Sequence, residues 1–142
     1  MKTRSMSVEA IVWLLAAAPA VAGELTVTDA WSRTTPPGIP VGVAYLTIRN
    51  GSAKSDRLLR LRTPVASSVE VHRTETVAGV ARMREVSVLH LAPGETVRAE
   101  PGGMHLMLMG LEKPLVAEQK FELEMLFEAA GPRKIIVLVR NP

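Results

Sequence analysis

Residues 104–109 of this chain spell MHLMLM, a strongly apolar run of six residues between turn-forming segments. Successive side chains of a β-strand point to opposite faces, so His105, Met107 and Met109 share one face. The opposite face carries only apolar side chains, namely Met104, Leu106 and Leu108. This alternation predicts a strand with one face in a hydrophobic core and another face that carries candidate metal ligands.

Short β-branched or alternating runs recur along the chain and are separated by turns rich in Gly, Pro and Asn. The expected strands are 25–30, 42–49, 57–62, 68–74, 81–89, 96–99, 104–109, 121–128 and 134–140. No segment beyond residue 22 has a convincing helical period. Eight or nine short strands with regular turns predict an all-β fold, an antiparallel Greek-key β-sandwich.

The first twenty-two residues have the pattern of an export signal. Lys2 and Arg4 give a positive start, residues 10–18 form a short apolar core, and Ala20-Val21-Ala22 resembles a cleavage site. The apolar core is far shorter than the roughly 20 residues that a membrane span needs. We therefore expect 1–22 to be a cleaved signal peptide and 23–142 to be a single domain, with a retained N-terminal anchor as the alternative.

Composition restricts the chemistry of the chain. It contains no cysteine, only 4% aromatic residues and a net charge of +3 at pH 7. This modest charge and the shortage of stacking side chains argue against a nucleic-acid partner. Thioethers resist oxidation better than thiolates, so methionine suits a metal site outside the cytoplasm. No nucleophile–base pair or paired carboxylates have a recognisable spacing, so we expect no enzyme activity.

A second pair of soft ligands, His72 and Met83, lies in a predicted hairpin. If residues 76–79 form a four-residue loop, Glu75 pairs with Val80 and His72 directly faces Met83. Directly opposed residues of an antiparallel pair share one face, so both side chains could reach one ion. A register shift of one residue would place them on opposite faces.

Imidazole nitrogens and thioether sulfurs form a soft, neutral ligand set that suits Cu(I) better than Zn(II), Mg(II) or Ca(II). The candidate ligands are His72, Met83, His105 and Met107. Each of them taken alone is more simply a surface or core-packing residue of a strand. The joint pattern of two His/Met pairs favours a metal site.

The spacing His72-x10-Met83-x21-His105-x-Met107 resembles the signature of the periplasmic copper chaperones of the PCu(A)C family. The flanking segments DAWSR, GVAYL and PGGMHLMLMGL are also similar to this family, and the similarity runs from about residue 25 to residue 140. The resemblance implies a cupredoxin-like β-sandwich that binds one Cu(I) per chain through these four residues. By the same resemblance, Met109 is a neighbour of the site rather than a ligand.

The resemblance further implies an exported metallochaperone of the bacterial periplasm that delivers copper by ligand exchange. The implied partners are apo cytochrome c oxidase subunit II and a Sco-type thiol protein. We expect a monomer without stable membrane insertion after cleavage. Two alternatives stay open: a copper sequestration or resistance protein with the same site, and a structural exported β-sandwich without metal.

Three other features of the sequence have simpler interpretations. His90 is expected to be an exposed residue at the end of a strand. Arg57, Arg60 and Arg62 are expected to form the solvated side of a strand rather than a docking patch. The sequon Asn50-Gly51-Ser52 is expected to be a tight turn rather than a glycosylation site.

Overall fold

The computed structural model describes residues 23–142, in which the regular structure is entirely β-strand. The strands are β1 (Leu25–Arg33), β2 (Val41–Asn50), β3 (Asp56–Arg62), β4 (Ser68–Val77), β5 (Val80–Glu85), β6 (Leu89–Leu91), β7 (Thr96–Ala99), β8 (His105–Met109), β9 (Lys120–Phe127) and β10 (Gly131–Arg140). The expected signal peptide, 1–22, lies outside the described residues. Within the described part, no helix is long and apolar enough to cross a membrane.

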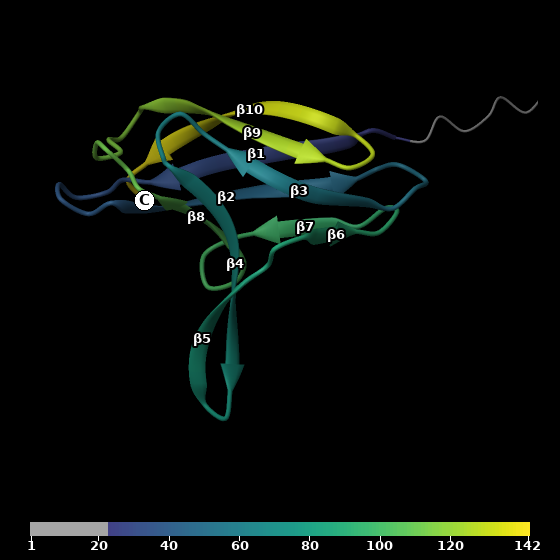
Figure 1. The fold of residues 1–142 in the computed structure, drawn as a ribbon, viewed down its shortest axis with the longest axis horizontal. Coiled ribbons are helices and arrows are strands. Elements are labelled where there is room, and N and C mark those ends of the chain that lie inside the picture. Colours follow the sequence, from purple (N-terminus) through teal and green to yellow (C-terminus); the bar gives the residue numbers. More distant parts are fainter. Residues whose placement is uncertain (1–22) are drawn as a thin grey trace, which may run out of the picture.

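The strands form one hydrogen-bonded path that folds over into a sandwich (Figure 1). Its order is β5-β4-β8-β2-β1-β10-β9-β3-β6, and β7 pairs with β2 beside β8. Neighbours such as β4 and β8 are distant in sequence, as crossing Greek-key connections require. Every pair is antiparallel except β1 and β10, which run parallel with Trp31 opposite Leu138. The predicted antiparallel sandwich is therefore confirmed with one parallel exception.

The core lies between the two layers and is filled by aliphatic side chains and two phenylalanines. Its most deeply buried members come from β2, β6, β8, β9 and β10 and the segment before β9: Ile48, Leu91, Leu108, Leu115, Leu123, Met125, Phe127, Val137 and Val139. In β8 the predicted alternation is confirmed, because Leu106 and Leu108 are buried in this core while Met107 and Met109 are only half-buried. The candidate ligands of β8 therefore lie on the outer face of its layer.

The predicted strand over 81–89 is in fact two strands that pair with different partners. β5 extends the β4 hairpin, whereas β6 pairs with β3 in the other layer, with Leu89 opposite Leu58. The chain must leave one layer and join the other between them. One continuous strand cannot pair in both layers. The local sequence pattern does not show this crossing, so one strand was predicted where the structure has two.

The turn after β2 is fixed by a fully buried Asn50. Its side-chain amide donates to the carbonyls of Lys54 (2.8 Å) and Leu91 (3.1 Å), and its Oδ1 accepts from the backbone N–H of Ser52 (3.1 Å). The predicted tight turn was wrong, because residues 51–55 form a five-residue connection between β2 and β3, which do not pair with each other. The asparagine side chain lies in the protein interior.

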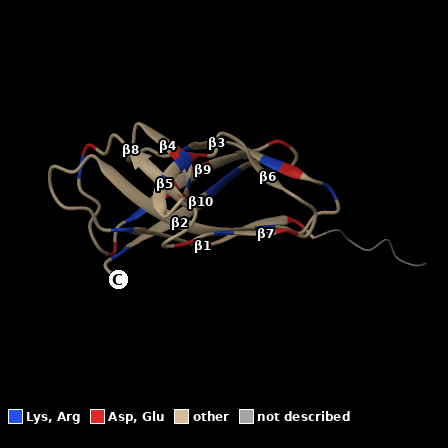
Figure 2. Cartoon of the chain, turned by 90° about the horizontal axis from the view of Figure 1, so that it is seen from below, with Lys and Arg blue, Asp and Glu red and all other residues tan. Residues whose placement is uncertain are grey.

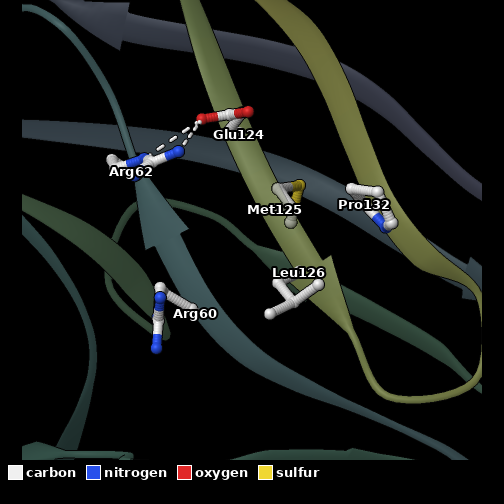
Figure 3. Close-up of a pocket in the computed structure, with 6 residues that line it drawn as sticks. All are labelled: Arg60, Arg62, Glu124, Met125, Leu126 and Pro132. Carbon is white, nitrogen blue, oxygen red and sulfur yellow. Dashed lines mark hydrogen bonds and ion pairs between the residues drawn. The ribbon is translucent and has the colours of Figure 1, made fainter.

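The arginines of β3 are half-buried or exposed. Basic and acidic residues are interspersed along the strands of the chain (Figure 2). Arg57 forms an ion pair with Glu128, and Arg62 donates to Glu124 at 2.9 Å beside a shallow pocket lined also by Arg60 (Figure 3). The predicted solvated side is confirmed. His90 is exposed in β6, also as predicted.

Candidate metal centre

Strands β4 and β8 bring three of the four candidate ligands together. His72 lies directly opposite His105, and Glu70 lies directly opposite Met107. Directly opposed residues of an antiparallel pair point to the same face. His72, His105 and Met107 therefore gather on the outer face of the layer, although the sequence places the first more than thirty residues before the others.

The two imidazole rings face each other with their centres 5.8 Å apart and their planes at 46°. Bonds from such metal ions to imidazole nitrogen are about 2 Å long, so an ion lies about 3 Å from the ring centre. Two rings can therefore share one ion when their centres are up to about 6 Å apart. The separation of His72 and His105 meets this condition.

One nitrogen of each ring lacks a hydrogen-bond partner. Among the buried side-chain nitrogens and oxygens of residues 23–142, only Nδ1 of His72 and Nε2 of His105 have none. An unpaired buried polar atom costs about 1–3 kcal/mol, so such atoms are uncommon in a core without a function. Two of them on facing rings are the arrangement that a metal ion would satisfy.

The other nitrogen of each ring is hydrogen-bonded, and this sets the protonation of the neutral ring. Nδ1 of His105 lies 3.0 Å from the carbonyl oxygen of Gly103, which can only accept, so Nδ1 carries the proton. Nε2 of His72 lies 2.8 Å from a carboxylate oxygen of Glu70 and donates to it. The unpartnered Nδ1 of His72 and Nε2 of His105 thus each present a lone pair.

Met83 does not lie opposite His72, so the predicted pairing was wrong. The β4–β5 loop contains two residues, not four: Val77 pairs with Val80, and Met83 lies opposite Thr74. Both loop residues, Ala78 and Gly79, have positive φ angles of 51° and 79°, which is the geometry of a type I′ hairpin turn. The four-residue loop was an assumption, and an alanine at the first loop position does not indicate the two-residue turn.

The register differs from the predicted one by two residues, so Met83 still shares the face of His72. It occupies a diagonal position, at which Cα atoms are about 7–8 Å apart and long side chains still meet. Met83 is 64% exposed on a hairpin that projects from the sandwich (Figure 1). The structure therefore brings His72, His105 and Met107 together. Met83 lies beside them on the solvent-exposed side of the group.

Glu70 was missed by the sequence analysis. It stands two residues before His72 and so shares its face, which the alternation of β4 would have revealed. Within residues 23–142, no three side chains of His, Cys, Asp or Glu are grouped as a metal site.

An aromatic cluster borders the centre on the adjoining strands. Val43 of β2 lies opposite Met107, and Tyr45, two residues further on the same face, lies opposite Trp31 of β1. The Trp31 and Tyr45 rings are 4.8 Å apart, and the guanidinium of Arg33 lies within 6 Å of both ring centres. On this side the centre is bordered by side chains of β1 and β2 rather than by a loop.

A β-sandwich with facing histidines and a methionine on one strand pair defines a class of soft-metal-binding domains. The family model described as "Putative lipoprotein LpqE-like" matches residues 25–139, and the chain belongs to this family. "Putative lipoprotein Lxx21020" from Leifsonia xyli is 30% identical over 116 residues, which are 81% of this chain and 69% of that protein. "Uncharacterized protein RP573" from Rickettsia prowazekii is 29% identical over 98 residues, which are 68% of this chain and 54% of that protein.

Solved structures give the same result. The copper-bound PCuAC domain from PmoF2 is similar with a TM-score of 0.71 and 25% identity, over 85% of this chain and 96% of that domain. The Cu(I) form of DR1885 from Deinococcus radiodurans is similar with a TM-score of 0.69 and 30% identity, over 87% of this chain and 83% of that one. The predicted PCu(A)C relationship and the cupredoxin-like β-sandwich are therefore confirmed.

Proposed function

We propose that this chain is a metallochaperone that carries one Cu(I) ion between His72, Met83, His105 and Met107. The observation that carries the proposal is the pair of buried, unpartnered nitrogens on the facing histidines beside Met107. The printed descriptions of two similar structures support it, because one is a copper-bound domain and the other a Cu(I) form. All four ligands are neutral, and thioether sulfur favours Cu(I) over Cu(II).

The four residues differ in burial, and this suggests different roles. His105 is only 7% exposed and would anchor the ion to the sandwich, with His72 and Met107 completing a fixed half of the site. Met83 is 64% exposed and would close the site from the hairpin. An acceptor's ligand can therefore replace Met83 first, and the ion then transfers by associative exchange of the remaining ligands.

The exposure of Met83 favours a carrier over a storage protein, because a storage protein would hold copper through ligands that competing molecules cannot reach. The acceptor that we propose is apo cytochrome c oxidase subunit II, assisted by a Sco-type thiol protein, and the family relationship supports this choice. A copper sequestration protein with the same ligands would instead hold its ion when mixed with the apo acceptor domain. Transfer monitored at stoichiometric copper separates the two functions.

Export to the periplasm forms part of the same proposal. The family and one relative are described as lipoproteins, which supports an exported protein. We propose that 1–22 is the signal peptide and that the mature chain acts as a monomer. We propose no enzymatic reaction, because copper is the cargo and is carried without change of oxidation state.

The proposal is tested by replacing Met107 with leucine, which keeps the size and removes the sulfur. We expect Cu(I) affinity in anaerobic chelator competition to fall by more than the about 10–100-fold typical of outer-shell changes, with the circular dichroism spectrum unchanged. X-ray absorption of the wild-type protein should show two sulfur and two nitrogen neighbours around copper.

The matched control is Met109→Leu, on the same strand and face but two residues further along. This variant should keep its Cu(I) affinity. Unchanged affinity of Met107→Leu, or an oxygen-rich copper environment in the wild-type protein, would contradict the proposed site.

A further inference from the structure

We infer that Glu70 is a positioning residue that selects which nitrogen of His72 binds the metal. This inference rests on the proposed function and deepens it. The carboxylate of Glu70 holds the Nε2–H of His72, so the ring presents Nδ1 to the ion. His105 presents its Nε2, so the two histidines would bind the same ion through different nitrogens.

The position of Glu70 is fixed by the β-sheet rather than by chance contact. It shares a face of β4 with His72 and lies directly opposite Met107 of β8. Its carboxylate oxygen lies 2.8 Å from Nε2 of His72, and the side chains of His72 and Glu70 are 18% and 36% exposed. Glu70 thus borders both His72 and Met107, and its carboxylate would act on the ion through the His72 ring to which it is bonded.

The hydrogen bond disfavours the alternative orientation of the His72 ring. Turning the ring over would point Nε2 away from Glu70 and leave that half-buried carboxylate without its partner. The carbonyl of Gly103 likewise fixes the orientation of the His105 ring. It accepts a hydrogen bond from Nδ1, so Nε2 is the nitrogen available to the metal. Nδ1 lies next to the ring carbon that carries the side chain, whereas Nε2 lies at the far end.

Glu70 also balances the charge of the centre. Four neutral ligands would leave the +1 charge of Cu(I) uncompensated on a partly buried face. A carboxylate bonded to a ligating imidazole offsets this charge and increases electron donation by the ring, and such outer partners typically contribute 10–100-fold to metal affinity. Among residues 23–142, Glu70 is the carboxylate that is hydrogen-bonded to a candidate ligand. Glu85 lies directly opposite His72 on β5 but forms no hydrogen bond with it, and the partner of His105 is a neutral carbonyl.

The inference is tested by nitrogen-15 NMR of the histidine rings in the Cu(I)-loaded protein, which is diamagnetic. We expect His72 to be protonated at Nε2 and metal-shifted at Nδ1, and His105 to show the opposite pattern. A metal-shifted Nε2 on His72 would overturn the inference and leave the copper proposal standing. Failure of the wild-type protein to bind Cu(I) would overturn both.

Two substitutions measure the contribution of Glu70. Glu70→Ala should weaken Cu(I) binding about 10–100-fold and remove the observable, slowly exchanging Nε2–H of His72 in the apo protein. Glu70→Gln retains an acceptor oxygen but no charge, so it should restore the Nε2–H signal and part of the affinity. Equal affinities for the wild-type protein and both variants would overturn the inference.

The matched control is Glu75→Ala, which removes one carboxylate from the same strand. Glu75 pairs with Arg84 rather than with a histidine. Its replacement should leave both the Nε2–H signal and the affinity unchanged. A loss equal to that of Glu70→Ala would show a general charge effect and would also overturn the inference.

Discussion

At the level of single residues, the centre depends on two hydrogen bonds that leave two lone pairs free. His72 and His105 each use one ring nitrogen for a fixed acceptor, Glu70 in one case and Gly103 in the other. These hydrogen bonds orient both rings, which would be an advantage for the proposed Cu(I) binding. Preorganised ligands lose little freedom on binding, so most of the interaction energy is retained as affinity.

Met83 should behave differently from Met107, because the exposed side chain can be replaced by an outside ligand. We expect Met83→Leu to weaken Cu(I) binding less than Met107→Leu does, and to speed the loss of copper to a competing chelator. Stopped-flow transfer under anaerobic conditions measures this rate. Val80→Ala, at another exposed position of the same hairpin, is the control. Identical losses for the two methionine variants would show that Met83 is as tightly held as Met107.

The residues of the site were only partly predictable from sequence. Alternation correctly placed His105 and Met107 on one face, because a strand has a fixed two-residue period. The predicted pairing of His72 with Met83 was wrong, because the true register depends on a positive φ angle at Ala78. An alanine in the sequence does not indicate this conformation. The meeting of β4 with β8 was also beyond local counting, since it is set by packing of the whole chain.

At the level of elements, the β4–β5 hairpin is the part most open to change. Its outer end packs on nothing in the described chain and exposes Val77, Val80 and Met83. The hairpin is therefore stabilised largely by its own turn and by the backbone hydrogen bonds between β4 and β5. Any loosening of this hairpin moves Met83 and leaves the fixed half of the centre in place.

The turn offers a direct test of this view. Ala78 has a φ of 51°, a region that costs an alanine about 1–2 kcal/mol. Asn-Gly is a preferred pair for type I′ turns, so Ala78→Asn should stabilise the hairpin locally by about 1 kcal/mol. Amide hydrogen exchange of β5 should then slow, while that of the core strands stays the same.

The opposite change is Gly79→Ala, which forces a second alanine into positive φ, here 79°. It should accelerate exchange in β5 by a comparable factor. Slower exchange in this variant, or faster exchange in Ala78→Asn, would mean that the hairpin has a different turn.

For the whole molecule, two exposed ion pairs join strands of the second layer. The hydrogen bond from Arg57, with its charge, lowers the pKa of Glu128 below the ordinary value, and Arg62 lowers the pKa of Glu124 in the same way. A carboxyl with a lowered folded-state pKa stabilises the fold above its unfolded pKa. That contribution disappears as the pH falls through the folded value. The effect is small, because water and salt screen exposed pairs.

The pH dependence can be isolated with the double variant Glu124→Gln, Glu128→Gln. We expect it to be less stable than the wild-type protein at pH 7 in urea unfolding, and the difference to shrink below about pH 4.5 as the wild-type carboxylates gain protons. Glu112→Gln, at an exposed glutamate without an ion pair among residues 23–142, is the control. A difference that grows on acidification would reverse the assigned sign.

The architecture was more predictable than the site. Strand positions follow from local alternation and turn residues, and nearly all of the expected strands are present with small shifts at their ends. The split of β5 from β6 and the parallel pairing of β1 with β10 were not predicted. Both features depend on which strands, although distant in sequence, become neighbours in the folded chain. Local sequence patterns do not show this.

The parallel pairing of β1 with β10 has a consequence for how the chain folds. The first and last strands are neighbours, so the β1 edge of the sheet stays unpaired until β10 has been made and delivered. An unpaired edge is a template for association with other chains, and pairings this distant form in milliseconds to seconds. Completion of the sandwich is therefore a late event, and a partly folded chain exposes an edge open to association until its last strand docks.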